Sequence, residues 1–92
     1  MNEHEIKLEF DAIIHKADDM DAAYVEIPYD IEKVFGTKRA KVHALFDGEP
    51  YDGLALKMGT PCYVIGVRKD IRKKTAKQPG DTIHVVLTPR MK

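Results

Sequence analysis

The chain has 92 residues, of which 43% are hydrophobic and 33% are charged, and its 15 basic residues balance its 15 acidic ones. This length and composition are typical of one soluble globular domain, which we predict to cover residues 1–92. They exclude a membrane-spanning helix, because no apolar run approaches the roughly 20 residues that cross a bilayer.

The first half of the chain predicts two strands, a short helix and a third strand. Apolar and charged residues alternate at its start, which is the period of a half-buried strand. Pro28 suits the first position of a helix, and Gly36 suits the residue that follows the last turn. The predicted elements are strand 5–12, a polar turn at 18–21, strand 24–27, a short helix between Pro28 and Gly36, and strand 38–46 with a hairpin turn after it.

The second half predicts the same elements in the same order. Pro79 cannot continue a helix, and Gly80 supplies the bend that leads into the last strand. The predicted elements are strand 50–58, turn 59–61, strand 62–67, helix 68–76, turn 78–81 and strand 82–88.

The two halves are copies of one another. Residues 10–13 recur as 51–54, 23–31 recur as 63–71, and 42–46 recur as 83–87. Three strands of this size cannot bury an apolar face alone, so we expect the halves 5–46 and 50–88 to pair. The prediction is a monomeric, mainly β fold: a six-stranded double-split β-barrel with an internal pseudo-two-fold repeat and two short helices.

Two resemblances accompany the repeat. Residues 67–74 followed by 78–83 resemble the swapped-hairpin signature of AbrB/MazE-type transcription factors, in which a strand, a short helix, a Pro-Gly-Asp turn and a closing strand follow one another. The whole pattern, over roughly residues 5–88, is similar to a small prokaryotic domain of unknown function, family nineteen-oh-five, which is sometimes fused to a YdeI-like domain. This second resemblance implies a fold and no site residue, because that family has no accepted activity.

The second predicted helix is strongly basic, since residues 68–77 hold six bases and one acid. Such a stripe could neutralise the phosphates of a nucleic acid or the acidic groups of a protein partner. The alternative is a solvated helix face whose cations suit the C-terminal end of a helix. The helix in the first half is not basic, so the copies differ most at this point. The candidate binding residues are Arg68, Lys69, Arg72, Lys73, Lys74 and Lys77.

The repeat also duplicates polar residues, in the pairs His43/His84, Asp30/Asp70 and Asp11/Asp52. A two-fold axis could bring the two imidazoles together, but no Cys, His or carboxylate spacing completes a metal site. We therefore expect that each histidine has its hydrogen bonds satisfied or lies at the surface. Asp30 and Asp70 fall in the first turns of the predicted helices, where a carboxylate stabilises the helix. This position favours a structural role over acid–base catalysis. The pair Asp11/Asp52 is interpreted in the same way.

Cys62 is the only cysteine and cannot form an internal disulfide, which favours a reducing, cytoplasmic setting. No base lies in its local motif, so we expect a small buried hydrophobe rather than a nucleophile. The tyrosines and phenylalanines are expected in the core.

The sequence holds no catalytic motif or phosphate-binding loop, so a protein without catalysis, cofactor or metal is favoured. Three hypotheses remain open. The first is a non-catalytic interaction module for a protein partner or a YdeI-like domain. The second is a nucleic-acid-binding or transcription-regulatory protein that uses the basic helix. The third is a small-ligand binder or enzyme with a groove at the barrel mouth. No membrane partner is expected.

Overall fold

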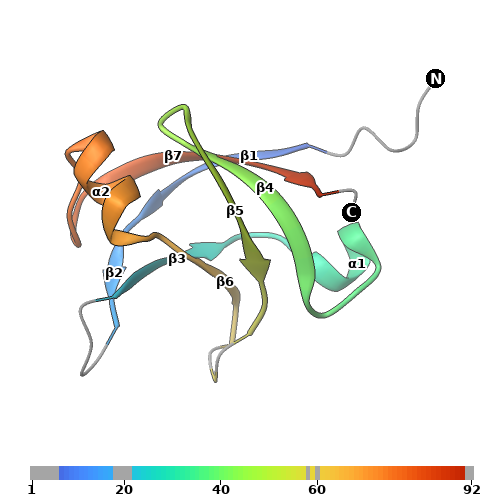
Figure 1. The fold of residues 1–92 in the computed structure, drawn as a ribbon. Coiled ribbons are helices and arrows are strands. Elements are labelled where there is room, and N and C mark those ends of the chain that lie inside the picture. Colours follow the sequence, from blue (N-terminus) through green and yellow to red (C-terminus); the bar gives the residue numbers. More distant parts are fainter. Residues whose placement is uncertain (1–6, 18–21, 58, 60, 91–92) are drawn as a thin grey trace.

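A computed structural model describes residues 7–17, 22–57, 59 and 61–90, and in these residues the chain is mainly β (Figure 1). The predicted order of elements in each half is confirmed, with one additional short strand, and the polar turn predicted at 18–21 lies outside the described residues. No helix in the described ranges is long and apolar enough to cross a membrane. The elements are β1 (Leu8–Ile13), β2 (His15–Lys16), β3 (Ala23–Ile27), α1 (Ile31–Phe35), β4 (Ala40–Phe46), β5 (Glu49–Ala55), β6 (Tyr63–Gly66), α2 (Lys69–Thr75) and β7 (Thr82–Pro89).

The strands form two antiparallel sheets whose order follows the two-fold symmetry of the repeat. The larger sheet has the order β1-β7-β4-β5, and the smaller one has the order β2-β3-β6. The repeat relates β1 to β5, β4 to β7 and β3 to β6. If each strand of the larger sheet is replaced by its counterpart, the same strand order results, read from the opposite edge. Each half also pairs its first strand with the last strand of the other half, β1 with β7 and β5 with β4. The halves are therefore interlocked.

The two sheets meet at two short junctions that are equivalent in the repeat. On one side, β1 continues past Ile14 into β2, where His15 pairs with Tyr24 of β3. On the other side, an isolated bridge joins Leu56, just after β5, to Val64 of β6. The predicted mainly β class with two short helices is thus confirmed. The described strands are divided between two sheets, and their closure into one barrel remains a prediction.

The core lies between the sheets and is built from alternate residues of the strands. In β4, for example, Val42 and Ala44 are fully buried, whereas Lys41 and His43 are exposed. The aromatic residues supply only part of this core: Phe46 and Tyr63 are buried, but Tyr29 is 40% exposed. The large side chains that are fully buried are Phe46, Ile14, Ile31, Ile65, Ile83, Leu87, Val25, Val42, Val64, Val67 and Val85.

The two helices begin differently, although they occupy equivalent positions on opposite sides of the molecule (Figure 1). Helix α1 begins after Asp30, later than the start predicted at Pro28, because the Asp30 side chain caps it by accepting a hydrogen bond from the Lys33 N–H at 3.3 Å. Gly36 ends α1 as predicted, with a φ of 80° that glycine adopts at little cost. Asp70 lies inside the first turn of α2, which has no side-chain cap.

We expect Asp30→Ala to lower the free energy of unfolding by about 1 kcal/mol, which is the usual cost of losing an N-cap. Asp70→Ala is the matched control. It removes an exposed carboxylate at the equivalent position but no cap, so it should cost well below about 1 kcal/mol. Urea denaturation of both variants checks the difference, and equal losses would show that Asp30 does not act as a cap.

Candidate binding surfaces

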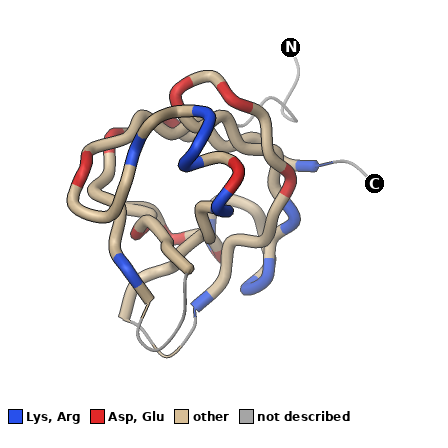
Figure 2. Tube along the Cα trace, turned by 60° about the vertical axis from the view of Figure 1, so that its left-hand side comes forward, with Lys and Arg blue, Asp and Glu red and all other residues tan. Residues whose placement is uncertain are grey.

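Helix α2 and its N-cap residue present four exposed bases, which we call the α2 surface: Arg68, Lys69, Lys73 and Lys74. Three of them, together with Asp70, line a shallow hollow of about 460 Å³. Figure 2, in which the side of the molecule that carries α2 comes forward, shows basic positions gathered on this helix. The structure therefore leaves these four predicted residues accessible on a single element.

Arg68 fixes the start of the α2 surface. Its Nε lies 3.3 Å from Asp70 Oδ1, and its guanidinium carbon lies 5.8 Å from the centre of the Tyr51 ring of β5. A cation over an aromatic ring is attracted by the negative face of that ring. The ion pair lies within the start of α2, and the contact with Tyr51 joins that start to the larger sheet.

The other two predicted binding residues have structural contacts. Arg72 is only 6% exposed, and its Nε donates a hydrogen bond to the Val67 carbonyl at 3.2 Å. Arg72 is a candidate binding residue in the sequence, but its side chain is buried and is not part of the exposed surface of α2. Lys77 is half-buried, and its Nζ donates to the Thr82 carbonyl at 2.9 Å and lies 3.4 Å from Asp47 Oδ2.

The outer face of the larger sheet carries two histidine–carboxylate pairs that the repeat relates. His43 Nδ1 lies 2.7 Å from Asp52 Oδ1, and His84 Nδ1 lies 2.7 Å from Asp11 Oδ1. The other ring nitrogen of His84 lies 2.8 Å from Glu9 Oε2. Each histidine thus pairs with a carboxylate from the other half, and the two imidazoles are surface residues, as expected. In the described part of the chain, no group of three or more His, Cys, Asp or Glu side chains could hold a metal ion.

These pairs perturb the titration of their members. The hydrogen bond with His43 lowers the pKa of Asp52, and the charge of Arg90 acts in the same direction. The hydrogen bonds with Asp11 and then Glu9 raise the pKa of His84. A histidine that serves as a general base needs a ring nitrogen directed at the group it deprotonates. In His84 both nitrogens face carboxylates, so its arrangement suits stabilisation of the sheet.

We expect the stabilising effect of His84 to depend on pH. Its pKa in the folded chain lies above the ordinary value of 6.5, so its contribution is complete below 6.5 and is lost as the pH rises through the raised value. The difference in Tm between the wild type and His84→Gln should therefore shrink as the pH is raised from just below 6.5 into the alkaline range.

The control combines Glu9→Gln with Asp11→Asn, which keeps the imidazole but removes its two carboxylate partners. This double variant should abolish the same pH dependence. Thermal unfolding followed by circular dichroism at several pH values provides the comparison, and a Tm difference that is constant with pH would contradict the assignment.

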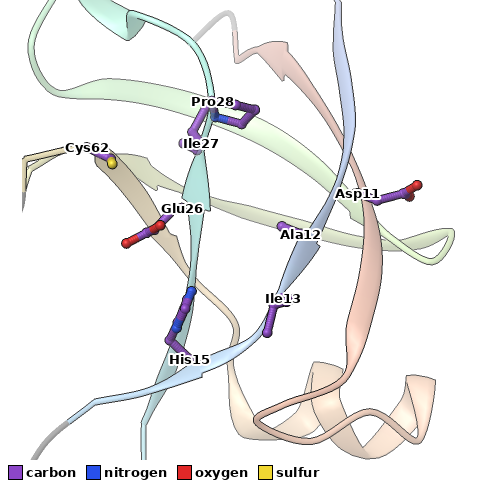
Figure 3. Close-up of a pocket in the computed structure, with 8 residues that line it drawn as sticks. All are labelled: Asp11, Ala12, Ile13, His15, Glu26, Ile27, Pro28 and Cys62. Carbon is purple, nitrogen blue, oxygen red and sulfur yellow. The ribbon is translucent and has the colours of Figure 1, made fainter.

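A groove of about 530 Å³ lies between β1 and β3 and is largely apolar, with walls formed by Ala12, Ile13, Ile27 and Pro28 (Figure 3). Its two acidic residues come from different strands, and Figure 3 shows the carboxylates of Asp11 and Glu26 pointing away from one another. The groove therefore does not bring together a carboxylate pair for acid–base chemistry.

Cys62 lines the same groove and is only partly buried, so the expectation of a buried hydrophobe is not met. It stands directly before β6 and is not among the residues of the core cluster. The remaining polar residue of the lining is His15, on the short strand β2.

These features define a small, mainly β domain with two interlocked halves and one basic helix. The chain belongs to the family described as "Domain of unknown function (DUF1905)", which it matches over residues 10–87. The family expected from the repeated segments is thus confirmed. No curated protein matches the chain.

Proposed function

We propose that this chain is a non-catalytic interaction module that binds an acidic partner through the α2 surface. The observation that carries the proposal is the set of four exposed bases on α2, at the place where the two halves of the repeat differ most. Shared folding geometry does not require these bases, because α1 occupies the equivalent position with one base and one acid.

The charges around α2 favour a short acidic segment of a protein over a long duplex. Asp70 pairs with Arg68, Asp47 pairs with Lys77, and Arg72 is buried, so the exposed positive charge is confined to a short stretch. A protein that follows a duplex makes many phosphate contacts, and α1, the counterpart of α2 in the first half, supplies no matching basic face. The partner we propose is an acidic protein segment, including one on a fused YdeI-like domain.

A nucleic acid is the second candidate, and the same basic helix supports it. Phosphates and carboxylates are both attracted to exposed Lys and Arg side chains. Fluorescence anisotropy with a labelled poly-glutamate peptide and a labelled DNA duplex, each at low and moderate salt, distinguishes the two. We expect the peptide to bind more tightly, with an affinity that falls as salt is added.

The test variant combines Lys69→Glu with Lys73→Glu, two exposed bases one helical turn apart. Peptide affinity should fall by about tenfold or more, since two attractions of up to about 1 kcal/mol each become repulsions. The matched control combines Lys33→Glu with Lys41→Glu. It makes the same change in net charge, and Lys33 is the repeat counterpart of Lys73.

If both double variants lost peptide affinity equally, the effect would depend on the net charge of the chain and not on the α2 surface, and the proposal would be contradicted. Tighter binding of the duplex, with loss only in the α2 variant, would establish the nucleic-acid alternative. If neither the peptide nor the duplex bound at low salt, both candidate partners would be excluded.

A further inference from the structure

A second basic feature lies away from α2. A hollow of about 470 Å³ opens between α1, the start of β4 and the strands β5 and β6. It is assembled from both halves of the repeat, because three of its residues lie between 32 and 39 and the other three lie between 56 and 63. They are Glu32, Lys38, Arg39, Leu56, Lys57 and Tyr63.

The hollow carries three bases and one acid. Across the described ranges, no ion pair within 4.0 Å engages Lys38, Arg39 or Lys57, although Glu32 lines the same space. Like charges gathered around a concave surface raise its potential and attract counter-ions. We therefore expect the hollow to attract an anion.

The remaining wall is aromatic and apolar. Tyr63 is 7% exposed, and Lys57 Nζ lies 5.1 Å from the centre of its ring. Burial raises the pKa of Tyr63, and the nearby carboxylates of Glu32 and Asp30 act in the same direction, so the phenol keeps its proton at neutral pH. Beside it, Leu56 offers an apolar contact.

The position that the repeat relates to this hollow has no full copy of the arrangement. The counterpart of Tyr63 is Ala23, and the counterpart of Glu32 is the buried Arg72. The Lys38-Arg39 pair corresponds to the turn at 78–80, which carries no charge. Lys57 corresponds to another base, Lys16, but folding geometry that the halves share does not account for Lys38 and Arg39.

We propose that this hollow is a binding site for a small organic phosphate. Lys38, Arg39 and Lys57 would surround the phosphate, because guanidinium and ammonium groups are the side chains that pair with phosphate oxygens. The carbon part of the ligand would contact Leu56 and the edge of Tyr63. The volume falls in the range of sites for small molecules. The site shares no residue with the α2 surface, so it does not depend on the function proposed above.

The experiment titrates the isotope-labelled full chain with ADP and, separately, with inorganic phosphate, and follows the backbone amides by NMR. The amides of Lys38, Arg39, Lys57 and Tyr63 should shift saturably with both probes. ADP should bind at least about fivefold more tightly than inorganic phosphate, because its carbon part adds apolar contact.

Two neutralising variants test the residues. Lys38→Gln with Arg39→Gln should weaken ADP binding about tenfold, and Lys57→Gln alone should weaken it several-fold. Lys69→Gln with Lys73→Gln on α2 removes the same charge as the first variant and should leave ADP binding unchanged. All these side chains are exposed, so each variant should fold, and its amide spectrum verifies this.

Chemical-shift changes confined to the amides of α2 would overturn the proposal. So would equal affinity for ADP and inorganic phosphate, or equal losses in the hollow and control variants.

Discussion

Replacement of Phe46 by alanine should lower the free energy of unfolding by about 3–5 kcal/mol, a large share of the roughly 5–14 kcal/mol expected for a chain of this length. Phe46 has no exposed surface and lies on β4, which pairs with β5 on one side and β7 on the other. Its ring centre lies 6.0 Å from that of Tyr51. Alanine would leave a cavity at a place held by strands from both halves, where collapse is difficult.

The measurement is urea denaturation followed by far-UV circular dichroism. Ile13→Ala serves as the control, because Ile13 is also a large hydrophobic residue on a strand but is 52% exposed. It should cost less than about 1 kcal/mol. Similar midpoints for the two variants would mean that the layer between the sheets is not the core.

The same experiment tests whether the chain is one domain. Because β1 pairs with β7 and β5 pairs with β4, each half completes the sheet of the other. The Phe46→Ala variant should therefore unfold in one transition that includes both halves. Leu87 is its counterpart in the repeat and is equally buried, so Leu87→Ala should cause a loss of about 2–5 kcal/mol, again in one transition. Two separate transitions would contradict a single domain over residues 1–92.

Most of the fold could be predicted from the sequence because its signals are local. Alternation of apolar and charged residues marks β1, and the glycine that follows α1 marks the end of that helix. The start of α1 was misplaced because a proline only permits a first helical position, whereas Asp30 supplies the hydrogen bond that defines it. The sequence does not predict β2, because this strand is two residues long and it pairs with β3 only after the chain passes from one sheet to the other at Ile14.

The binding surfaces were harder to predict, because they depend on contacts between distant segments. The repeat identifies His84 and Asp11 as duplicated residues but does not reveal that they pair across the interlocked halves. The basic hollow joins residues that lie far apart in the chain. One signal could have found it: the Lys38-Arg39 doublet stands where the second half has an uncharged turn.

Arg72 shows the limit of helical periodicity. The spacing in the sequence places Arg68 and Arg72 on one side of a helix, but it does not say whether that side faces solvent. In the structure Ile71 and Arg72 are both buried, so α2 turns a mixed face toward the rest of the molecule. A long side chain can bury its aliphatic part and still hydrogen-bond at its end, and Arg72 does so at the Val67 carbonyl.

Arg72→Glu should therefore leave the chain largely unfolded. The glutamate would place a carboxylate in a buried site beside the Val67 carbonyl oxygen, where an ionised carboxylate has no hydrogen to donate. Burying an unpaired charge costs several kcal/mol, and the buried stem of the arginine would be lost as well. Lys73→Glu, at the next residue, changes the same charge on an exposed side chain and should cost less than about 1 kcal/mol.

Thermal and urea unfolding of the two variants test this contrast, and Arg72→Met separates its causes. Methionine keeps much of the apolar stem and adds no charge, so its cost should lie between those of the two glutamate variants. Equal stability of Arg72→Glu and Lys73→Glu would mean that α2 can expose Arg72 without loss, and Arg72 would then return to the candidate binding residues. With the expected result, loss of partner binding in an Arg72 variant reports unfolding, and only the exposed bases of α2 can be used to test binding.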